Sequence, residues 1–221
     1  MNLFLTIVSG LAWTIVYIEA IRLGFRYRTY AIPVAALGLN LAWETIYGIH
    51  GLTGTISAQS IINLVWAAAD AVIVFTFLRF GRRELPPFVT RPLFVGWALV
   101  VFGISFAVQA LFIGEFGWDG GARYSAFLQN LLMSGLFIAM LVARRGVRGQ
   151  SLVIAVAKWL GTLAPTILFG ALAGRPFILW IGLLCSVLDL IYLGLLWAAK
   201  RNPVAFAAPP EVDVQVVARP A

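Results

Sequence analysis

The segment 176–198, with the sequence PFILWIGLLCSVLDLIYLGLLWA, carries a single charged residue, Asp189, in a predominantly apolar run. Its length suits a helix that crosses a lipid bilayer, because a hydrocarbon core of about 30 Å needs about 20 apolar residues. Six further segments meet the same demand, namely 3–23, 31–50, 57–79, 92–113, 123–143 and 150–173. The sequence therefore predicts an all-α polytopic membrane protein, built as a bundle of seven transmembrane helices.

The composition of the chain agrees with this fold class. Hydrophobic residues make up 62% of the chain and charged residues only 11%, with a mean hydropathy of +0.95. An ordinary soluble domain contains about 25% charged residues. We expect residues 1–201 to form one seven-helix transmembrane domain. Residues 202–221 lack hydrophobic periodicity and are expected to form a disordered cytoplasmic tail.

The basic residues, which give a net charge of +7, gather in alternate loops. One set of loops contains Arg22, Arg26, Arg28, Arg79, Arg82, Arg83, Arg91, Arg144, Arg145, Arg148, Lys200 and Arg201. The opposite set carries only Arg123 and Arg175, beside Glu115 and Asp119. Since basic loops stay in the cytoplasm, we predict a multi-pass protein of the cell membrane with its N-terminus outside and its C-terminus inside. The basic loops would face anionic membrane lipids, and no nucleic-acid partner is expected.

Five ionisable residues lie inside the predicted spans: Glu19, Glu44, Asp70, Lys158 and Asp189. A charge at the bilayer centre costs about 2.5–3.5 kcal/mol on insertion scales, so each needs a physical reason. Glu19 lies near a helix end and can pair with Arg22, and we interpret it as structural. From the rise of about 1.5 Å per residue, Asp70, Lys158 and Asp189 are all expected about 20 Å below the outer surface. Lys158 is predicted to neutralise one of the two aspartates. Two interpretations of this ion pair stay open: it belongs to a functional site, or it only joins helices.

Polar and aromatic residues share helical faces by the i, i+3, i+4, i+7 spacing. The second span presents Asn40, Trp43, Glu44 and Tyr47, the third Asn63, Trp66 and Asp70, the fifth Gln129, Asn130 and Ser134, and the seventh Ser186, Asp189 and Tyr192. Such stripes predict a polar chamber inside the bundle, ringed by aromatic side chains.

A carboxyl group in such a chamber can act as a general acid, because desolvation disfavours its anion and keeps it protonated. Proton donation to an apolar substrate creates a carbocation, which the faces of Trp and Tyr stabilise. Protonation of an alkene or epoxide in a prenyl chain fits these demands. A proton-coupled small-molecule transporter is the alternative, since transporters also bury carboxyl groups, although we find no internal repeat.

Three motifs resemble those of the small integral-membrane terpene cyclases of fungal meroterpenoid and indole-diterpene pathways, whose bacterial relatives cyclise prenylated indoles. These motifs are Asn40-x-x-Trp43-Glu44-x-x-Tyr47, Asp70 in the third span and Leu188-Asp189-x-x-Tyr192 in the seventh. The resemblance covers the size and topology of all seven spans. It implies an enzyme that starts cyclisation by protonating a terminal alkene or epoxide, with Glu44 and Asp189 as the essential acids. Lys158 matches no hallmark of that family.

Neither a metal nor another cofactor is expected. The chain has no Asp-Asp-x-x-Asp cluster to bind magnesium and pyrophosphate, and no Asp-x-Asp-Asp run of the soluble protonating cyclases. Its single histidine, His50, and single cysteine, Cys185, argue against a zinc site. A retinal protein is disfavoured because the seventh span has no lysine before Lys200.

The sequence therefore predicts a metal-independent terpene cyclase for a lipid-soluble prenylated substrate, an indole or another meroterpenoid precursor. Glu44 is the predicted proton donor, and Asp189 is predicted as a second catalytic acid or as its partner in holding the proton. The predicted substrate-binding residues are Asn40, Trp43, Tyr47, Asn63, Trp66, Asp70, Asn130, Lys158 and Tyr192.

Overall fold

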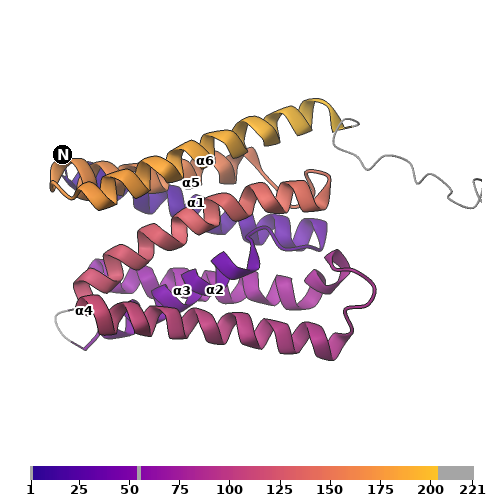
Figure 1. The fold of residues 1–221 in the computed structure, drawn as a ribbon, viewed down its shortest axis with the longest axis horizontal. Helices are drawn as coiled ribbons and strands as arrows, with labels where there is room; N and C mark the ends of the chain where they lie inside the picture. Colours follow the sequence, from indigo (N-terminus) through magenta and orange to yellow (C-terminus); the bar gives the residue numbers. More distant parts are fainter. Residues whose placement is uncertain (1, 54–55, 204–221) are drawn as a thin grey trace, which may run out of the picture.

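The computed structural model describes residues 2–53 and 56–203, and all regular structure in these ranges is helical. The elements are α1 (Asn2–Tyr27), α2 (Val34–His50), α3 (Ala58–Phe80), the 3-10 segment η1 (Gly81–Glu84), α4 (Arg91–Arg144), α5 (Leu152–Pro165), the π-helical segment η2 (Thr166–Leu172) and α6 (Pro176–Arg201). Figure 1 shows them side by side along the long axis of the molecule. The predicted all-α class is confirmed.

Local sequence signals explain where several helices begin. The side chains of Ser57, Thr90 and Ser151 cap α3, α4 and α5 by accepting hydrogen bonds from backbone N–H groups of the first turn. The predicted span 150–173 is interrupted at Pro165, which has no N–H to donate to the preceding turn. The chain continues beyond it as the π-helical segment η2.

Helix α4 contains 54 residues and is sharply kinked at Gly117, which has φ 68° and ψ 178°. Only glycine adopts this backbone conformation readily. The kink divides α4 into a first arm, residues 91–116, and a second arm, residues 118–144, that turns back along the bundle (Figure 1). The sequence predicted two helices, 92–113 and 123–143, with a loop between them. That loop is wrong, because the helix breaks at one residue and resumes at the next.

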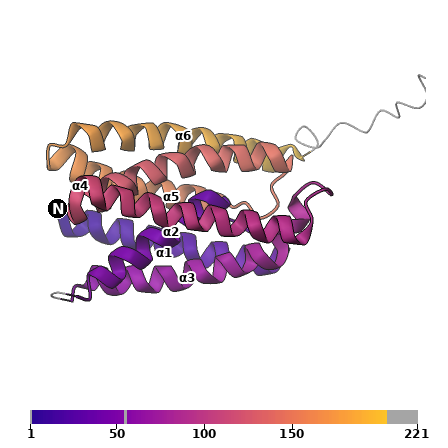
Figure 2. The same cartoon turned by 60° about the horizontal axis from the view of Figure 1, so that its bottom comes forward.

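Neighbouring helices form a closed ring in the order α1, α5, α6, α4, α2 and α3, with α3 packed again on α1. Sequence neighbours such as α1 and α2 are therefore separated in the ring, whereas α1 and α5 pack together. Figure 2 shows α1, α2 and α3 on one side of the bundle and α6 on the other. A ring of this kind can enclose a chamber.

The polarity of the molecule is inverted relative to a water-soluble protein. Large apolar side chains face outward along the helices, with Leu3 73% and Leu111 72% exposed. The ionisable side chains of Glu44, Asp70 and Asp189 are instead buried. Exposed apolar area on this scale suits contact with lipid rather than water, so the predicted membrane location is supported by the packing itself.

Five helical stretches of the described chain are long and apolar enough to cross a membrane: Leu3–Tyr27, Ala58–Glu84, Arg91–Arg144, Leu152–Leu172 and Pro176–Arg201. The helix α2, with 17 residues, is not among them. Three expectations therefore stay predictions: the seven membrane crossings, the N-terminus on the outer side, and the boundary between the transmembrane domain and the tail at residue 201. Most of the predicted tail, residues 204–221, lies outside the described residues.

The basic loops meet at one end of the bundle. Arg144 donates to the backbone oxygen of Tyr30 at 2.9 Å, and Arg148 donates to that of Tyr27 at 2.8 Å. Both guanidinium groups lie within 4 Å of the Glu84 carboxylate. These contacts join the α1–α2 connection, η1 and the α4–α5 connection, as the alternating charge pattern predicts.

Candidate active site

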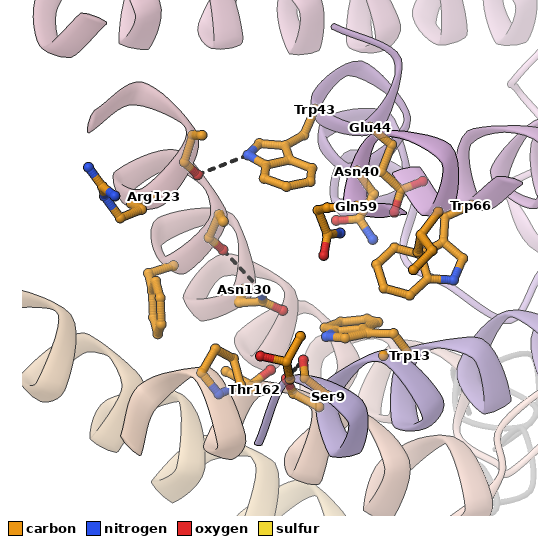
Figure 3. Close-up of a pocket in the computed structure, with 18 of the residues that line it drawn as sticks. Ser9, Trp13, Asn40, Trp43, Glu44, Gln59, Trp66, Arg123, Asn130 and Thr162 are labelled. Carbon is orange, nitrogen blue, oxygen red and sulfur yellow. Dashed lines mark hydrogen bonds between the residues drawn. The ribbon is translucent and has the colours of Figure 1, made fainter. Parts of the chain in front are cut away.

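A cavity of about 350 Å³ lies inside the ring of helices (Figure 3). Its described lining comes from α1, α2, α3, the second arm of α4, α5 and η2, and none of it from α6. The larger part of the lining is apolar. The polar and aromatic lining residues are Thr6, Ser9, Trp13, Tyr17, Asn40, Trp43, Glu44, Gln59, Trp66, Arg123, Phe127, Gln129, Asn130, Thr162 and Phe169.

Glu44 is the only carboxylic acid among the described lining residues. Its side chain is 5% exposed, and its Oε1 accepts a hydrogen bond from the Tyr17 hydroxyl of α1. Its Oε2 has no hydrogen-bond partner in the described part of the chain. Tyr17 therefore holds one oxygen in place, and the other oxygen, which is also buried, is left without a fixed partner.

Asp70 of α3 lies behind this pair, close enough to interact electrostatically with both Glu44 and Tyr17. It is fully buried and does not line the cavity. Neither of its carboxyl oxygens has a hydrogen-bond partner among the residues described. Two acids and a phenol thus meet at one side of the chamber, where three helices converge.

Aromatic rings form the walls next to Glu44. The Tyr17 ring packs against the Trp66 ring with centroids 5.8 Å apart. The indole N–H of Trp43 donates to the backbone oxygen of Ala122 at 3.0 Å, and that of Trp66 donates to Thr14 Oγ1 at 3.2 Å. These hydrogen bonds fix the ring planes, and in Figure 3 the indoles of Trp43 and Trp66 lie on either side of Glu44.

A chain of amide hydrogen bonds joins α4 to α2. Gln109 Nε2 on the first arm donates to Gln129 Oε1 on the second arm at 2.9 Å. Gln129 Nε2 donates to Asn40 Oδ1 at 3.2 Å. The chain orients Asn40, one of the predicted site residues, at the cavity wall.

A second buried polar centre lies outside the cavity. Lys158 Nζ donates to Asp189 Oδ1 and to Ser134 Oγ, each at 2.7 Å. Lys158 and Asp189 are 1% and 2% exposed. The prediction that Lys158 pairs with one of the two aspartates is confirmed, and the partner is Asp189. Asp70 belongs instead with Glu44.

The predicted site residues therefore divide into two groups. Asn40, Trp43, Glu44, Trp66 and Asn130 line the cavity, whereas Tyr47, Asn63, Asp70, Lys158, Asp189 and Tyr192 do not. The second group lies deeper or elsewhere in the bundle. Asn63 Oδ1 accepts a hydrogen bond from the lining residue Gln59 at 2.7 Å, and the Tyr192 hydroxyl donates to Gln150 Oε1 at 3.0 Å. For this group, direct contact with a substrate stays a prediction.

Several lining residues were not predicted, above all Trp13, Tyr17 and Arg123. Trp13 and Tyr17 are four residues apart in a helix and share one face, so the spacing that identified the α2 stripe could have found them. Arg123 is the first residue of the predicted span 123–143, and it was counted with the loop charges rather than with the site. Among the described residues, no group of three His, Cys, Asp or Glu side chains could hold a metal ion.

Comparisons with known proteins find one family. The profile of the Pyr4-like transmembrane terpene cyclases matches residues 1–202. Terpene cyclase pyr4 of Aspergillus fumigatus is 27% identical over 210 residues, which cover 89% of this chain and 86% of the relative. The Pyr4-family terpene cyclase mfmH of Annulohypoxylon moriforme is 30% identical over 169 residues, covering 75% and 68%. Terpene cyclase dpchB of Colletotrichum higginsianum is 26% identical, covering 90% and 88%. No solved structure matches the chain.

Proposed function

The chain belongs to the Pyr4-like transmembrane terpene cyclases, and from this premise we propose that Glu44 starts cyclisation by protonating a prenyl alkene or epoxide inside the cavity. The protein is a membrane enzyme that cyclises a lipophilic terpenoid substrate. The observation that carries the proposal is the position of Glu44, the single acid among the described lining residues. The transporter alternative finds no support in the three relatives described above, each of which is named a terpene cyclase.

The proton is held by the pair that Glu44 and Asp70 form. Two neighbouring carboxyl groups in an apolar surrounding disfavour simultaneous ionisation, so the pair retains a proton that can be given away. Tyr17 occupies Glu44 Oε1, which leaves Oε2 as the oxygen that carries the transferable proton. The Tyr17 hydroxyl then stabilises the carboxylate that forms when the proton has left.

The carbocation is stabilised by the surrounding rings. Protonation of the terminal alkene forms a C–H bond and leaves a cation on the neighbouring carbon; protonation of an epoxide opens its C–O bond and forms a hydroxyl group. Attack by the next double bond of the prenyl chain closes a ring and moves the charge along. The indole faces of Trp13, Trp43 and Trp66 stabilise the positive charge through cation–π interactions. Loss of a proton in the last step restores the acid, so the product is an isomer of the substrate.

Asp189 takes a different role from Glu44 in this scheme. Its carboxylate is paired with Lys158 outside the cavity. We therefore assign Asp189 a positioning role: together with Lys158 and Ser134 it fixes α6, α5 and the second arm of α4 around the chamber. The resemblance to the family led us to expect a catalytic acid at this position, and the two assignments make different predictions for paired variants.

We extend the proposal to the substrate and to the position of the enzyme in the membrane. The substrate is a prenylated indole or another meroterpenoid precursor that enters from the lipid. The enzyme crosses the cell membrane seven times, with α2 and the two arms of α4 counted as separate crossings. The basic end that contains Arg144, Arg148 and Glu84 then faces the cytoplasm and its anionic lipids.

The test is an incubation of membranes that contain the protein with farnesylated and geranylgeranylated acceptors in deuterium oxide. From an acceptor with a terminal alkene we expect a cyclic product one mass unit heavier than its substrate, because one deuterium is gained at the protonated carbon and one proton is lost in the last step. A cyclic product of this alkene without deuterium at that carbon would overturn initiation by an enzyme acid. Membranes without the protein serve as the control for spontaneous cyclisation.

A further inference from the structure

A second cavity, of about 360 Å³, lies at the basic end of the bundle and shares no described lining residue with the central one. Its walls come from α1, from the connection between α4 and α5, and from the last turn of α6. The lining residues are Glu19, Arg22, Leu23, Tyr27, Val147, Arg148, Gln150, Ser151 and Lys200. Three of them are cationic and one is acidic, so the cavity has the charge balance of a site for an anion.

The one acid of this cavity is already satisfied. Glu19 accepts two hydrogen bonds from the guanidinium of Arg22, at 2.6 and 2.7 Å, and a third from the Ser151 hydroxyl at 2.9 Å. Its negative charge is therefore balanced by Arg22. The other two cations, Arg148 and Lys200, leave the cavity with a net positive charge.

Arg148 is held at the cavity wall by backbone oxygens rather than by a carboxylate of its own. Its guanidinium donates to the backbone oxygens of Tyr27 at 2.8 Å and Arg28 at 3.3 Å. The Glu84 carboxylate lies 3.8 Å from Arg148 and 3.7 Å from Arg144, both beyond hydrogen-bond distance. One carboxylate thus faces two guanidinium groups, and their charge is only half balanced.

The ammonium group of Lys200 takes part in no ion pair or hydrogen bond within residues 2–53 and 56–203. The next residue, Arg201, differs from it in position: its guanidinium lies over the Trp197 ring, 3.9 Å from the centroid, and does not line the cavity. Lys200 therefore brings three unused N–H donors to the cavity.

The cavity lies where three apolar helices end. The helices α1 and α6 end at Tyr27 and Arg201, and α5 begins at Leu152. Each belongs to a stretch that is long and apolar enough to cross a membrane. The ends of such helices lie at the level of the lipid head groups. Phosphate groups of lipids are the anions at this level, and lysine and arginine attract the anionic ones.

We propose that this cavity binds the phosphate group of an anionic membrane lipid through Lys200 and Arg148, with Arg22 adding positive charge. The bound phosphate joins the end of α6 to the α4–α5 connection and so stabilises the ring of helices at its basic end. The inference rests on the proposed function only for the place of this end in the membrane. It does not depend on the role of Glu44.

The test measures lipid binding to the full chain in a neutral detergent, with phosphatidylglycerol as the probe and phosphatidylcholine as the zwitterionic reference. Native mass spectrometry counts the lipids that stay bound. We expect the wild type to retain one phosphatidylglycerol in preference to phosphatidylcholine. In K200Q the apparent Kd for phosphatidylglycerol should rise about fivefold or more, because one cation at the phosphate is lost.

R201Q is the matched control, since it removes the same charge from the adjacent residue outside the cavity. Its apparent Kd should stay within about twofold of the wild type. Lys200 is exposed, so its replacement leaves the packing of the core intact. Equal effects of K200Q and R201Q would show a diffuse attraction by the basic end and would overturn the site, as would undiminished binding in K200Q.

The melting temperature gives a second readout, because a ligand that binds only the folded state stabilises it. Phosphatidylglycerol should raise the melting temperature of the wild type and of R201Q more than that of K200Q. Inorganic phosphate offers the same chemistry without acyl chains and should have no such effect. Stabilisation of the wild type by inorganic phosphate but not by phosphatidylglycerol would assign the cavity to a soluble phosphate compound and overturn the lipid proposal.

The variant E44Q separates this inference from the proposed function. It should bind phosphatidylglycerol as the wild type does, whether or not Glu44 proves to be the proton donor. Loss of phosphatidylglycerol binding in E44Q would place the lipid in the central cavity, where Glu44 lies, and would overturn the proposal.

Discussion

Tyr17 on α1 donates a hydrogen bond to Glu44 on α2, and this contact joins two helices that are not direct neighbours in the ring. The phenol is buried and lines the cavity, and its ring packs against Trp66 of α3. The contact therefore fixes both the position of the acid and the aromatic wall beside it.

Replacing Glu44 by Gln should abolish most of the cyclase activity. The amide keeps the shape of the side chain but has no acidic proton to give, and general acid catalysis contributes about 100-fold or more. We expect the initial rate of isomer formation in membranes to fall by at least that factor. Glu19→Gln is the matched control, because Glu19 is an acid of α1 that pairs with Arg22 and does not line the cavity. Equal loss in both variants would contradict a special role for Glu44.

Replacing Tyr17 by Phe should slow proton donation without unfolding the protein. The ring and its packing on Trp66 remain, but the hydrogen bond that stabilises the Glu44 carboxylate after proton transfer is lost. Such a bond to a charged group amounts to about a tenfold change in rate. We expect kcat to fall about tenfold with little change in KM, and the melting temperature in detergent to stay close to that of the wild type. A rise in KM alone would indicate that Tyr17 only shapes the cavity.

Replacing Lys158 by Met should destabilise the protein, because it leaves the Asp189 carboxylate buried without its cation. Removing one partner of a buried ion pair costs about 3–5 kcal/mol, whereas replacing both by apolar residues is often neutral. K158M should therefore lower the melting temperature in detergent, and K158M/D189L should restore it. If Asp189 only positions helices, the double variant also recovers cyclisation. Restored stability without activity would show that Asp189 takes part in the chemistry.

The faces of single helices could be predicted from the sequence, because helical periodicity depends only on residue spacing. Asn40, Trp43 and Glu44 do share the cavity wall, as predicted. The neighbours of each helix could not be predicted in the same way, because ring order is set by packing between distant segments. The helix α3 packs on α1 and α2, whereas α5 packs on α6. Depth alone placed Lys158 near both Asp70 and Asp189, and only the ring order separates the two acids.

The position of the kink in α4 could not be predicted from the sequence for a related reason. The region between the two arms contains Gly114, Gly117, Gly120 and Gly121, and composition indicates a break without saying which glycine makes it. Arg123, the first residue of the predicted span 123–143, was consequently counted with the loop charges. Once the helix resumes at residue 118, Arg123 comes to lie at the cavity wall.

Replacing Gly117 by Ala should weaken the fold at the point where α4 turns back. A side chain at this position would meet open space, so the cost is backbone strain from a φ of 68° combined with a ψ of 178°. Strain of this kind costs about 1–3 kcal/mol. We expect a lower melting temperature in detergent and lower cyclase activity, since the second arm carries the lining residues Gln129 and Asn130.

The control is Gly114→Ala, three residues earlier in the helical part of α4. A side chain there also meets open space, and alanine should stabilise the helix by about 0.5–1 kcal/mol. The same loss in both variants would show that α4 tolerates no added side chain here, and that the turn does not depend on the backbone freedom of Gly117.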